Sequence, residues 1–319
     1  MSQTKLQPAA KVAKTQAMPL PHRRRGIYKT PGDWAVDIVI AALITAIVLM
    51  VLYPLWFLLI ASVSNQNLVN TGKVVWWPKG WSTYGYEQIF KDSRIWTGYA
   101  NTILYTVAGT ALNLVVTLPA AFALSRRELK GRRIVMFFFT VTMFVSGGLI
   151  PTYLLYESLG LLDNWLVFVI PSAVNVYNLI IARSFFETSI PEELHDAAQI
   201  DGLSYFGYFI KIVVPLSSAI IAVIGLYYMV AHWNDFFTGL VYIQTTSKQP
   251  LQLVLRDILL SNQAMSGGNG SVDGAGYGQE FADSIKYGVI IVSTLPLLIV
   301  YPFIQKYFNK GVMIGAVKG

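Results

Sequence analysis

The chain has 319 residues, of which 54% are hydrophobic and only 13% carry a charge. Soluble domains carry about a quarter charged residues, so this composition, with a mean hydropathy of +0.51, predicts an integral membrane protein. The net charge of +7 comes from short basic clusters beside apolar stretches, which argues against nucleic-acid binding. The absence of Cys excludes disulfides, thiolate metal sites and Cys nucleophiles. The three His residues show no metal-ligand spacing, so no metal site is expected.

The first 32 residues form a polar, basic segment that is rich in Ala, Gln and Pro. The segment lacks the apolar core of a signal peptide. We expect a disordered cytoplasmic tail here, and a second, short cytoplasmic tail at residues 309–319. Residues 33–308 are predicted to form one transmembrane domain.

Six apolar stretches are each long enough to cross a bilayer as a helix, which takes about 20 residues. They lie at about residues 37–62, 97–125, 134–156, 165–186, 213–240 and 284–308. Prolines inside these stretches are acceptable in a bundle, where neighbouring helices satisfy the freed carbonyls. The sequence therefore predicts an all-α integral membrane protein with six transmembrane helices.

Lys and Arg are distributed unevenly among the segments that join these stretches. Seventeen of the 24 fall on the side that holds both termini, and six fall on the other side. Basic side chains are enriched on the cytoplasmic side of membrane proteins. We therefore expect both termini and residues 189–212 in the cytoplasm, and residues 63–96 and 244–283 outside.

The two outer segments have distinctive compositions. The first contains the aromatic residues Trp76, Trp77, Trp81, Tyr84, Tyr86 and Trp96, which is typical of an interfacial belt and also compatible with a platform for sugar stacking. The second combines an apolar stretch at 250–260 with a Gly-rich run at 267–278. That run lacks the Gly-Lys-Ser/Thr of a nucleotide cradle, so it is either a flexible loop or a contact for an external partner.

The pattern of residues 189–212 predicts a helix–turn–helix. Ser189 and Pro191 mark a helix start, and the helix dipole favours the acidic residues that follow, Glu192, Glu193 and Asp196. The packed side of this helix is expected to contain Leu194, Ala197, Ala198 and Ile200. Gly202 permits the left-handed backbone that ends the helix, and a second helix has an apolar stripe of Tyr205, Phe206, Phe209 and Ile210. By these features alone, the segment is an interfacial helix pair that packs on its own bundle.

The spacing within this segment resembles a known docking signature. Asp196, Ala197, Ala198, Gly202, Ile212 and Pro215 match the EAA loop of the membrane subunits of ABC importers, E-A-A-x3-G-x9-I-x-L-P, with Asp in place of Glu and Val214 in place of Leu. Such subunits use this loop to bind a separate ATPase. The resemblance implies a docking site that contains Glu193, Asp196, Ala197, Ala198, Asp201, Gly202, Ile212 and Pro215.

Further runs extend the resemblance over nearly the whole chain from residue 33. The WNDFF run at 233–237, the PLQLVLRDIL run from residue 250 and the closing GVMIGAVKG resemble carbohydrate-import permeases of the maltose-permease type. The SGGLIPTYLL run from residue 146 resembles the branch that includes alginate permeases. This implies the type I permease fold in a bacterial inner membrane. It also implies four kinds of partner or substrate: a homologous second permease, two ATP-binding subunits, an external solute-binding protein and an oligosaccharide.

The chain lacks a Walker motif, so we expect a transport subunit without its own cofactor, with ATP and Mg on the partner ATPases. Polar residues inside a membrane are costly and often functional. Those expected on a sugar path, or as glue between helices, are Asn101, Asn113, Asn175, Asn178, Tyr227, Tyr228, His232 and Asn234.

Three alternatives remain open at this point. One is an ABC permease for a different small solute. Another is a secondary sugar transporter, although the chain has almost no ionisable residue near mid-membrane. The third is a membrane enzyme that uses Asp273, Glu280 and Asp283. An acidic saccharide is favoured by the resemblance to the alginate branch and by the outer cations Lys73, Lys79, Arg94, Lys248 and Arg256. The outer carboxylates of Glu87, Asp92, Asp257, Asp273, Glu280 and Asp283 offset these cations, so a neutral oligosaccharide stays an alternative.

Overall fold

The computed structural model describes residues 31–267, 285–302 and 305. The predicted N-terminal tail, most of the Gly-rich run, the group Asp273, Glu280 and Asp283, and the C-terminal tail lie outside these ranges. The regular elements of the described residues are all helices, and one isolated antiparallel bridge joins Ser64 and Trp81. The chain divides into two compact units, residues 1–54 and residues 55–319, and each is considered by itself.

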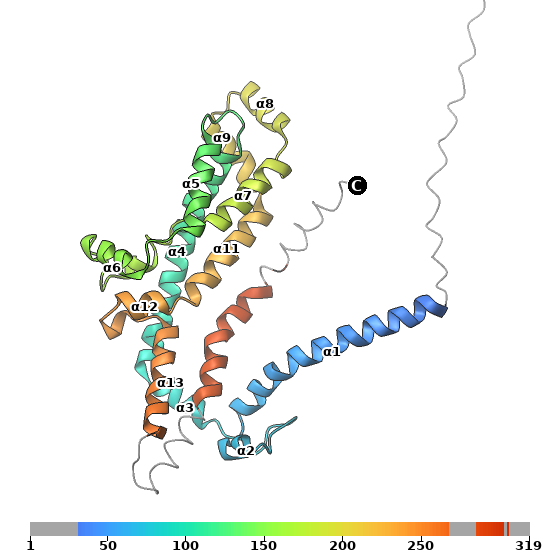
Figure 1. Cartoon of the computed structure of the whole chain (residues 1–319), viewed down its shortest axis with the longest axis vertical. Helices are drawn as coiled ribbons and strands as arrows, with labels where there is room; N and C mark the ends of the chain where they lie inside the picture. The colour runs from blue at the N-terminus through green and yellow to red at the C-terminus, as the bar shows by residue number, and fades with distance from the viewer. Residues whose placement is uncertain (1–30, 268–284, 303–304, 306–319) are drawn as a thin grey trace, which may run out of the picture. The chain divides into compact units, whose positions relative to one another are not determined.

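The elements follow one another along the chain as α1 (Pro31–Ser62), α2 (Gln66–Asn70), α3 (Tyr84–Lys91), α4 (Ser93–Ser125), α5 (Arg132–Phe144), α6 (Leu149–Ser158), η1 (Trp165–Phe168), α7 (Val176–Ser189), α8 (Glu192–Ile200), α9 (Tyr205–Tyr208), η2 (Phe209–Val213), α10 (Val214–Leu216), α11 (Ser218–Trp233), α12 (Phe237–Tyr242), η3 (Thr246–Lys248) and α13 (Leu251–Gly267) (Figure 1). A further helix covers Ile285–Pro302. Here η1 and η3 are 3₁₀ turns, and η2 is a turn of π-helix.

Three of these helices are long and apolar enough to cross a membrane: α1, α4 and Ile285–Pro302. Two bent pairs reach the same length together. They are α5 with α6, bent by 115°, and Tyr205–Leu216 with α11, bent by 84°. The described residues thus contain three to five candidate spans, and the predicted count of six is not confirmed.

The differences from the six predicted stretches arise where the backbone breaks inside an apolar run. In the third stretch, Gly147 and Gly148 separate α5 from α6, and Gly148 has a φ of +85°, which only Gly adopts without strain. In the fourth stretch, residues 169–175 are not helical, and α7 begins only after its N-cap Asn175. Hydropathy cannot detect such breaks, because the separated pieces are equally apolar.

Helix α4 lies at the centre of the second unit and packs against α7, α11 and α13 (Figure 1). Its contact with α7 and α11 includes Leu118, Phe122, Leu179, Phe186 and Ile224, all less than 9% exposed. Small residues let the helices approach closely, as is usual in membrane bundles. A side chain at Gly98 would meet the backbone of Leu251 at 3.0 Å.

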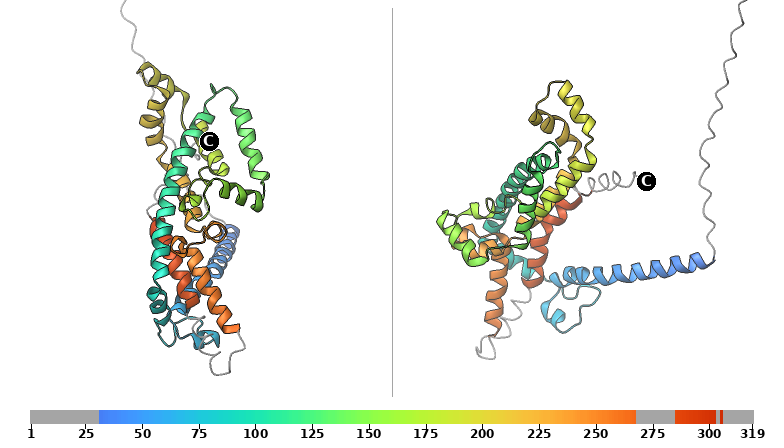
Figure 2. Two further views of the ribbon diagram at one scale, coloured as in Figure 1. Left: turned by 90° about the vertical axis from the view of Figure 1, so that its left-hand side faces the viewer. Right: turned by 45° about the horizontal axis from the view of Figure 1, so that its top comes forward.

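A second apolar cluster joins the other end of α4 to α13 and to the helix Ile285–Pro302. Two hydrogen bonds fix the last helix: the hydroxyl of Tyr99 donates to the carbonyl of Val292, and Trp233 Nε1 donates to the carbonyl of Ser293 at 3.0 Å. The helices α8 and α9 lie at the opposite end of the bundle from α3 and α13 (Figures 1 and 2). This separation places the predicted docking segment and the second predicted outer segment at opposite ends.

Candidate functional site

The predicted helix–turn–helix is present as α8, a turn at Asp201 and Gly202, and α9. Gly202 has a φ of +74°, and the amide of Leu203 donates to the carbonyl of Ala198 at 2.9 Å. This bond, from the residue after the glycine back across the last helical turn, closes a Schellman motif. Ser204 then caps α9, since its Oγ accepts from the amide of Gly207 at 3.2 Å. The sequence signals at Gly202 therefore predicted the turn correctly.

The two faces of α8 differ from the prediction. His195 and Ala198 are buried, and the His195 ring packs against Tyr205 and Tyr208. The expected packed side was wrong in three of its four members, because Leu194, Ala197 and Ile200 are exposed, Ile200 by 87%. The reason is rotation of the helix: in an α-helix the positions three apart share a face, and here that pair is His195 and Ala198. The exposed face includes Glu193, Asp196, Ala197 and Ile200.

The remaining residues of the predicted docking site lie in and beyond this turn. Asp201 and Gly202 are exposed, Ile212 is half-buried in the π turn η2, and Pro215 is exposed in α10. The π turn was not predicted from the sequence. Only α10 separates it from the 84° bend into α11, and such turns are frequent at functional sites.

Arginines that the sequence analysis treated only as topology signals bind helix ends beside α8. Arg183 Nε donates to the carbonyl of Leu124 at 3.1 Å, and Arg132 donates to the carbonyl of Ser125 at 3.2 Å. These carbonyls end α4, where cations complement the helix dipole. Arg126 in turn donates to the carbonyl of Phe186 on α7 at 3.2 Å.

Glu187 completes this cluster, which we call the arginine network. Its carboxylate lies 2.6 Å from Arg183 and 3.4 Å from Arg132. Nearby, Arg127 pairs with Glu192 of α8 at 3.2 Å, but both side chains are more than half exposed, so this contact contributes little. The arginine network therefore joins the ends of α4 and α7 to the start of α5. Helix α7 ends at Ser189, two residues before Pro191, the N-cap of α8.

Three of the predicted sugar-path residues are buried and bond within the bundle. His232 Nε2 lies 2.7 Å from Asn113 Oδ1, and the hydroxyl of Tyr228 lies 2.7 Å from Thr117 Oγ1 and accepts from the amide of Asn175 at 2.9 Å. Asn178 is also buried. These contacts join neighbouring helices, which is the structural role that the sequence left open beside a sugar path.

The other sugar-path candidates are more accessible. Asn101 is half-buried and donates to the carbonyls of Ser247 and Gln249. Asn175 caps α7 and is exposed, as is Asn234, whose amide donates to the carbonyl of Val230 in its own helix. Tyr227 is 42% exposed. Of the set, Tyr227, Asn175 and Asn234 remain able to meet a solute.

A carboxylate that the sequence did not point to holds together two loops, the one that precedes η1 and the one between α12 and η3. Asp163 accepts from the amide and hydroxyl of Thr245, from the amide of Gln244, and from Lys248 Nζ at 2.9 Å. The Thr245 hydroxyl and the Lys248 ammonium hold the pKa of Asp163 well below its usual value. Asp163 has a φ of +50°, which Asp tolerates better than most residues. The signal available in the sequence was only an Asp-Asn pair after a glycine.

No group of three His, Asp or Glu side chains within the described ranges could hold a metal ion. A model of the family "binding-protein-dependent transport system inner membrane component" matches residues 95–314. The chain belongs to this family. Its members are membrane permease subunits of ABC importers, transport components rather than enzymes, and they contain no cofactor of their own. Membership implies a partner permease, an ATPase and a solute-binding protein, and agrees with a bacterial inner-membrane location.

Individual relatives cover almost the same length. The chain is 38% identical over 283 residues to the polygalacturonan/rhamnogalacturonan transport system permease protein YtcP of Bacillus subtilis, covering 89% of this chain and 98% of that protein. It is 38% identical to the protein LplC of the same organism, covering 83% and 89%. A solved structure of a bacterial ABC transporter involved in the import of the acidic polysaccharide alginate matches with a TM-score of 0.78 at 33% identity, covering 88% of this chain and 99% of that one. The all-α, type I permease fold expected from the sequence is thereby confirmed.

Proposed function

We propose that this chain is one permease subunit of an ATP-driven importer that moves an acidic oligosaccharide into the cytoplasm. Its partners would be a homologous second permease, two ATP-binding subunits and an external solute-binding protein. Two matched proteins support the substrate class by their names, one for polygalacturonan, a uronic-acid polymer, and one for alginate. These likenesses span more than four fifths of this chain.

The observation that carries the ATPase part of the proposal is the exposed face of α8. Glu193, Asp196 and Ala197 project from a short helix whose other side, with His195 and Ala198, is anchored in the bundle. A small side chain at Ala197 lets a second surface approach the helix closely. Ala198 would then act by positioning α8, and Ile200 joins the surface open to the ATPase.

The orientation of the chain belongs to the proposal as well. We place both termini and α8 in the cytoplasm, because the basic residues favour that side. Single cysteines can test this, since the chain contains none of its own. Cysteines at Asp201 and in the run 267–278 should be labelled from opposite sides of the membrane. Labelling from the same side would contradict the topology.

A neutral oligosaccharide remains the second candidate, because most of the predicted outer cations are paired. Arg94 pairs with Asp92 at 2.6 Å, Lys248 with Asp163 at 2.9 Å and Arg256 with Asp257 at 3.5 Å. Their charges are largely compensated locally, which leaves Lys73 and Lys79 as the cations of this set without an ion pair to a described residue. Recognition of a uronate would then depend on hydrogen bonds and on the binding protein.

Uptake by the complete importer in proteoliposomes decides between these substrates. Oligogalacturonate or oligoalginate should be accumulated in an ATP-dependent manner, and a neutral oligomer of the same length should compete poorly. Equal uptake of the neutral oligomer would remove the acidic assignment. Uptake of amino acids or ions with no response to any saccharide would overturn the sugar class.

A further inference from the structure

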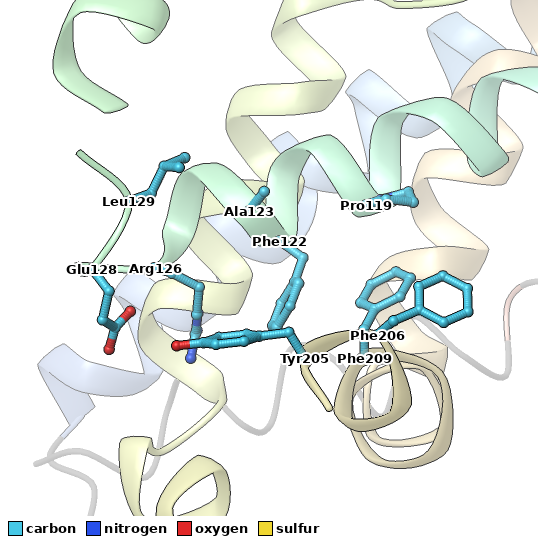
Figure 3. A pocket seen from close by; sticks show the side chains of 9 residues that line it. All are labelled: Pro119, Phe122, Ala123, Arg126, Glu128, Leu129, Tyr205, Phe206 and Phe209. Carbon is cyan, nitrogen blue, oxygen red and sulfur yellow. The ribbon is translucent and has the colours of Figure 1, made fainter. Parts of the chain in front are cut away.

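A cavity of about 440 Å³ lies between the end of α4 and the short helix α9 with η2 (Figure 3). Three groups of residues line it. Helix α4 contributes Pro119, Phe122 and Ala123, the segment that follows it contributes Arg126, Glu128 and Leu129, and the α9–η2 segment contributes Tyr205, Phe206 and Phe209. Its volume falls in the range of small-molecule pockets.

The cavity is polarised along α4. Figure 3 shows Arg126 and Glu128 at one end of it, and Pro119, Phe206 and Phe209 at the other. Pro119 precedes Arg126 by seven residues, about 10 Å of helix rise, so the apolar end points along a membrane-spanning helix toward its middle. A molecule that fits would have a charged group at the helix end and a hydrocarbon part beside α4.

The charged residues that line the cavity are Arg126 and Glu128, and the sequence that adjoins them is positive overall. Residues 126–133 carry five basic side chains, Arg126, Arg127, Lys130, Arg132 and Arg133, and one acidic side chain, Glu128. If the carboxylates of Glu128, Glu187 and Glu192 each neutralise one of these five basic side chains, a net charge of two positive units remains. Arg126 is 8% exposed, and its guanidinium bonds only neutral groups, the Ser125 hydroxyl and the Phe186 carbonyl, among the residues that the structure describes.

The rim of the cavity consists of large apolar side chains that the bundle does not cover. Phe206 is 73% exposed and Leu129 is 41% exposed, while Tyr205 presents its ring and a polar tip. Clusters of Lys and Arg beside a membrane-spanning helix attract anionic headgroups, and long basic side chains reach the headgroup level from beside the hydrocarbon.

We propose that this cavity binds an anionic phospholipid. One acyl chain would lie along Pro119 and Ala123 of α4 and against the exposed ring of Phe206, and the phosphate would be held by Arg126 and the flanking basic residues. Because η2 is joined through α10 to the 84° bend before α11, the bound lipid would stabilise the segment that follows the Gly202 turn. The proposal depends on the cavity and the charges around it, so its test does not depend on which substrate the importer transports.

The direct test measures which lipid stays with the purified full chain. The protein is equilibrated in micelles with equal amounts of phosphatidylglycerol, phosphatidylethanolamine and phosphatidylcholine, and bound lipid is counted by native mass spectrometry. Retention of phosphatidylglycerol should exceed that of phosphatidylcholine about ten-fold. Equal retention of all three lipids would overturn the proposal.

Variants separate the cavity from general lipid contact. Ala123 is an exposed residue that lines the cavity, so Ala123→Trp fills it without entering the core, and phosphatidylglycerol retention should fall at least five-fold. Ala111→Trp, at an exposed position of α4 that does not line the cavity, is the matched control and should retain the lipid. The double variant Lys130→Gln with Arg133→Gln should bring phosphatidylglycerol and phosphatidylcholine to equal retention. Loss of phosphatidylglycerol retention in both Trp variants, or in neither of them, would contradict the proposed lipid site.

A second measurement needs no variant. Phosphatidylglycerol with a photoreactive acyl chain should label peptides 119–129 and 205–209 at least five times as strongly as peptides that contain Ile103, Leu104 and Val107. These three side chains are exposed elsewhere on α4. Equal labelling would show ordinary lipid contact around the helix and would remove the proposal.

Discussion

Arg183 and Glu187 lie one turn apart on α7 and form a 2.6 Å ion pair, while Arg183 Nε donates to the last turn of α4 through the carbonyl of Leu124. One side chain thus ties two helices together immediately before the segment that leads into α8. If an ATPase that binds α8 moves this segment, we expect the contact to pass the movement on to α4.

Replacing Glu187 tests this path. Glu187→Gln should lower stability in detergent by about 0.5–1 kcal/mol, because both ion pairs are partly exposed and partly screened. In the reconstituted importer, solute moved per ATP hydrolysed should fall. Glu157→Gln, on the exposed side of α6, is the control. An unchanged ratio of transport to hydrolysis would mean that the arginine network only stabilises the fold.

Gly202 provides a graded test of the docking turn. Its φ is +74°, and nothing lies within 4 Å of an added Cβ, so only the backbone conformation is at issue. Gly202→Val should cost roughly 1–3 kcal/mol locally and abolish transport with normal membrane insertion, whereas Gly202→Asn should retain much of it, because Asn tolerates this conformation. Full transport and stimulated ATP hydrolysis in the Val variant would identify the segment as an interfacial helix pair.

Gly109 allows the contact of α4 with α11. A Cβ at this position would overlap the ring of His232, so Gly109→Ala should destabilise the bundle by about 1–3 kcal/mol. Gly225→Ala is the matched control on α11, since its Cβ would meet Leu114 at an ordinary 3.6 Å. Thermal unfolding in detergent measures both. Equal melting temperatures of the two variants would show that α11 can move away from α4 without cost.

Neighbouring tyrosines should respond differently to loss of the hydroxyl. Tyr228→Phe leaves Thr117 and the Asn175 amide without their partner, and should cost roughly 1–3 kcal/mol of stability. Tyr227→Phe removes the hydroxyl of a residue that is 42% exposed, and should change the transport KM with little change in unfolding temperature. The reverse pattern would exchange the roles assigned to the two residues.

The contacts of Asp163 with Gln244, Thr245 and Lys248 predict a dependence of local stability on pH. The pKa of Asp163 in the folded chain lies below the ordinary value of 3.8, so the deprotonated form stabilises the fold. The stabilisation is fully present above the ordinary value and is lost as the pH falls below it toward the folded pKa. Amide exchange of Gln244 and Thr245 should accelerate relative to a reference loop over that range. Asp163→Asn keeps the backbone conformation accessible, and in this variant the amides of Gln244 and Thr245 should already exchange fast at neutral pH. Protection of these amides equal to that in the parent chain would show that the Asp163 carboxylate does not hold the two loops together.

The sequence by itself determined the membrane class, the apolar stretches and the turn at Gly202. These features are local, because hydropathy, Pro and Gly act over one helix or one turn. The spacing from Asp196 to Pro215 also identified the segment that the family match now places in an importer permease. Knowledge of the family, rather than residue chemistry, supplied the expected partners and the saccharide.

Only the tertiary structure decided which side of each element faces the bundle. The sequence placed Leu194, Ala197, Ala198 and Ile200 on the packed side of α8, but of these only Ala198 is buried, together with His195. It could not tell that Tyr228 and His232 bond across helices while Tyr227 stays exposed, or that Asp163 meets Lys248 across 85 residues of chain. Apolar and amide side chains are acceptable on several faces of a helix in a membrane, so the pattern leaves rotation open. Close packing of α4, α7 and α11 removes that freedom, because only one set of rotations brings small residues such as Gly109 opposite large ones such as His232.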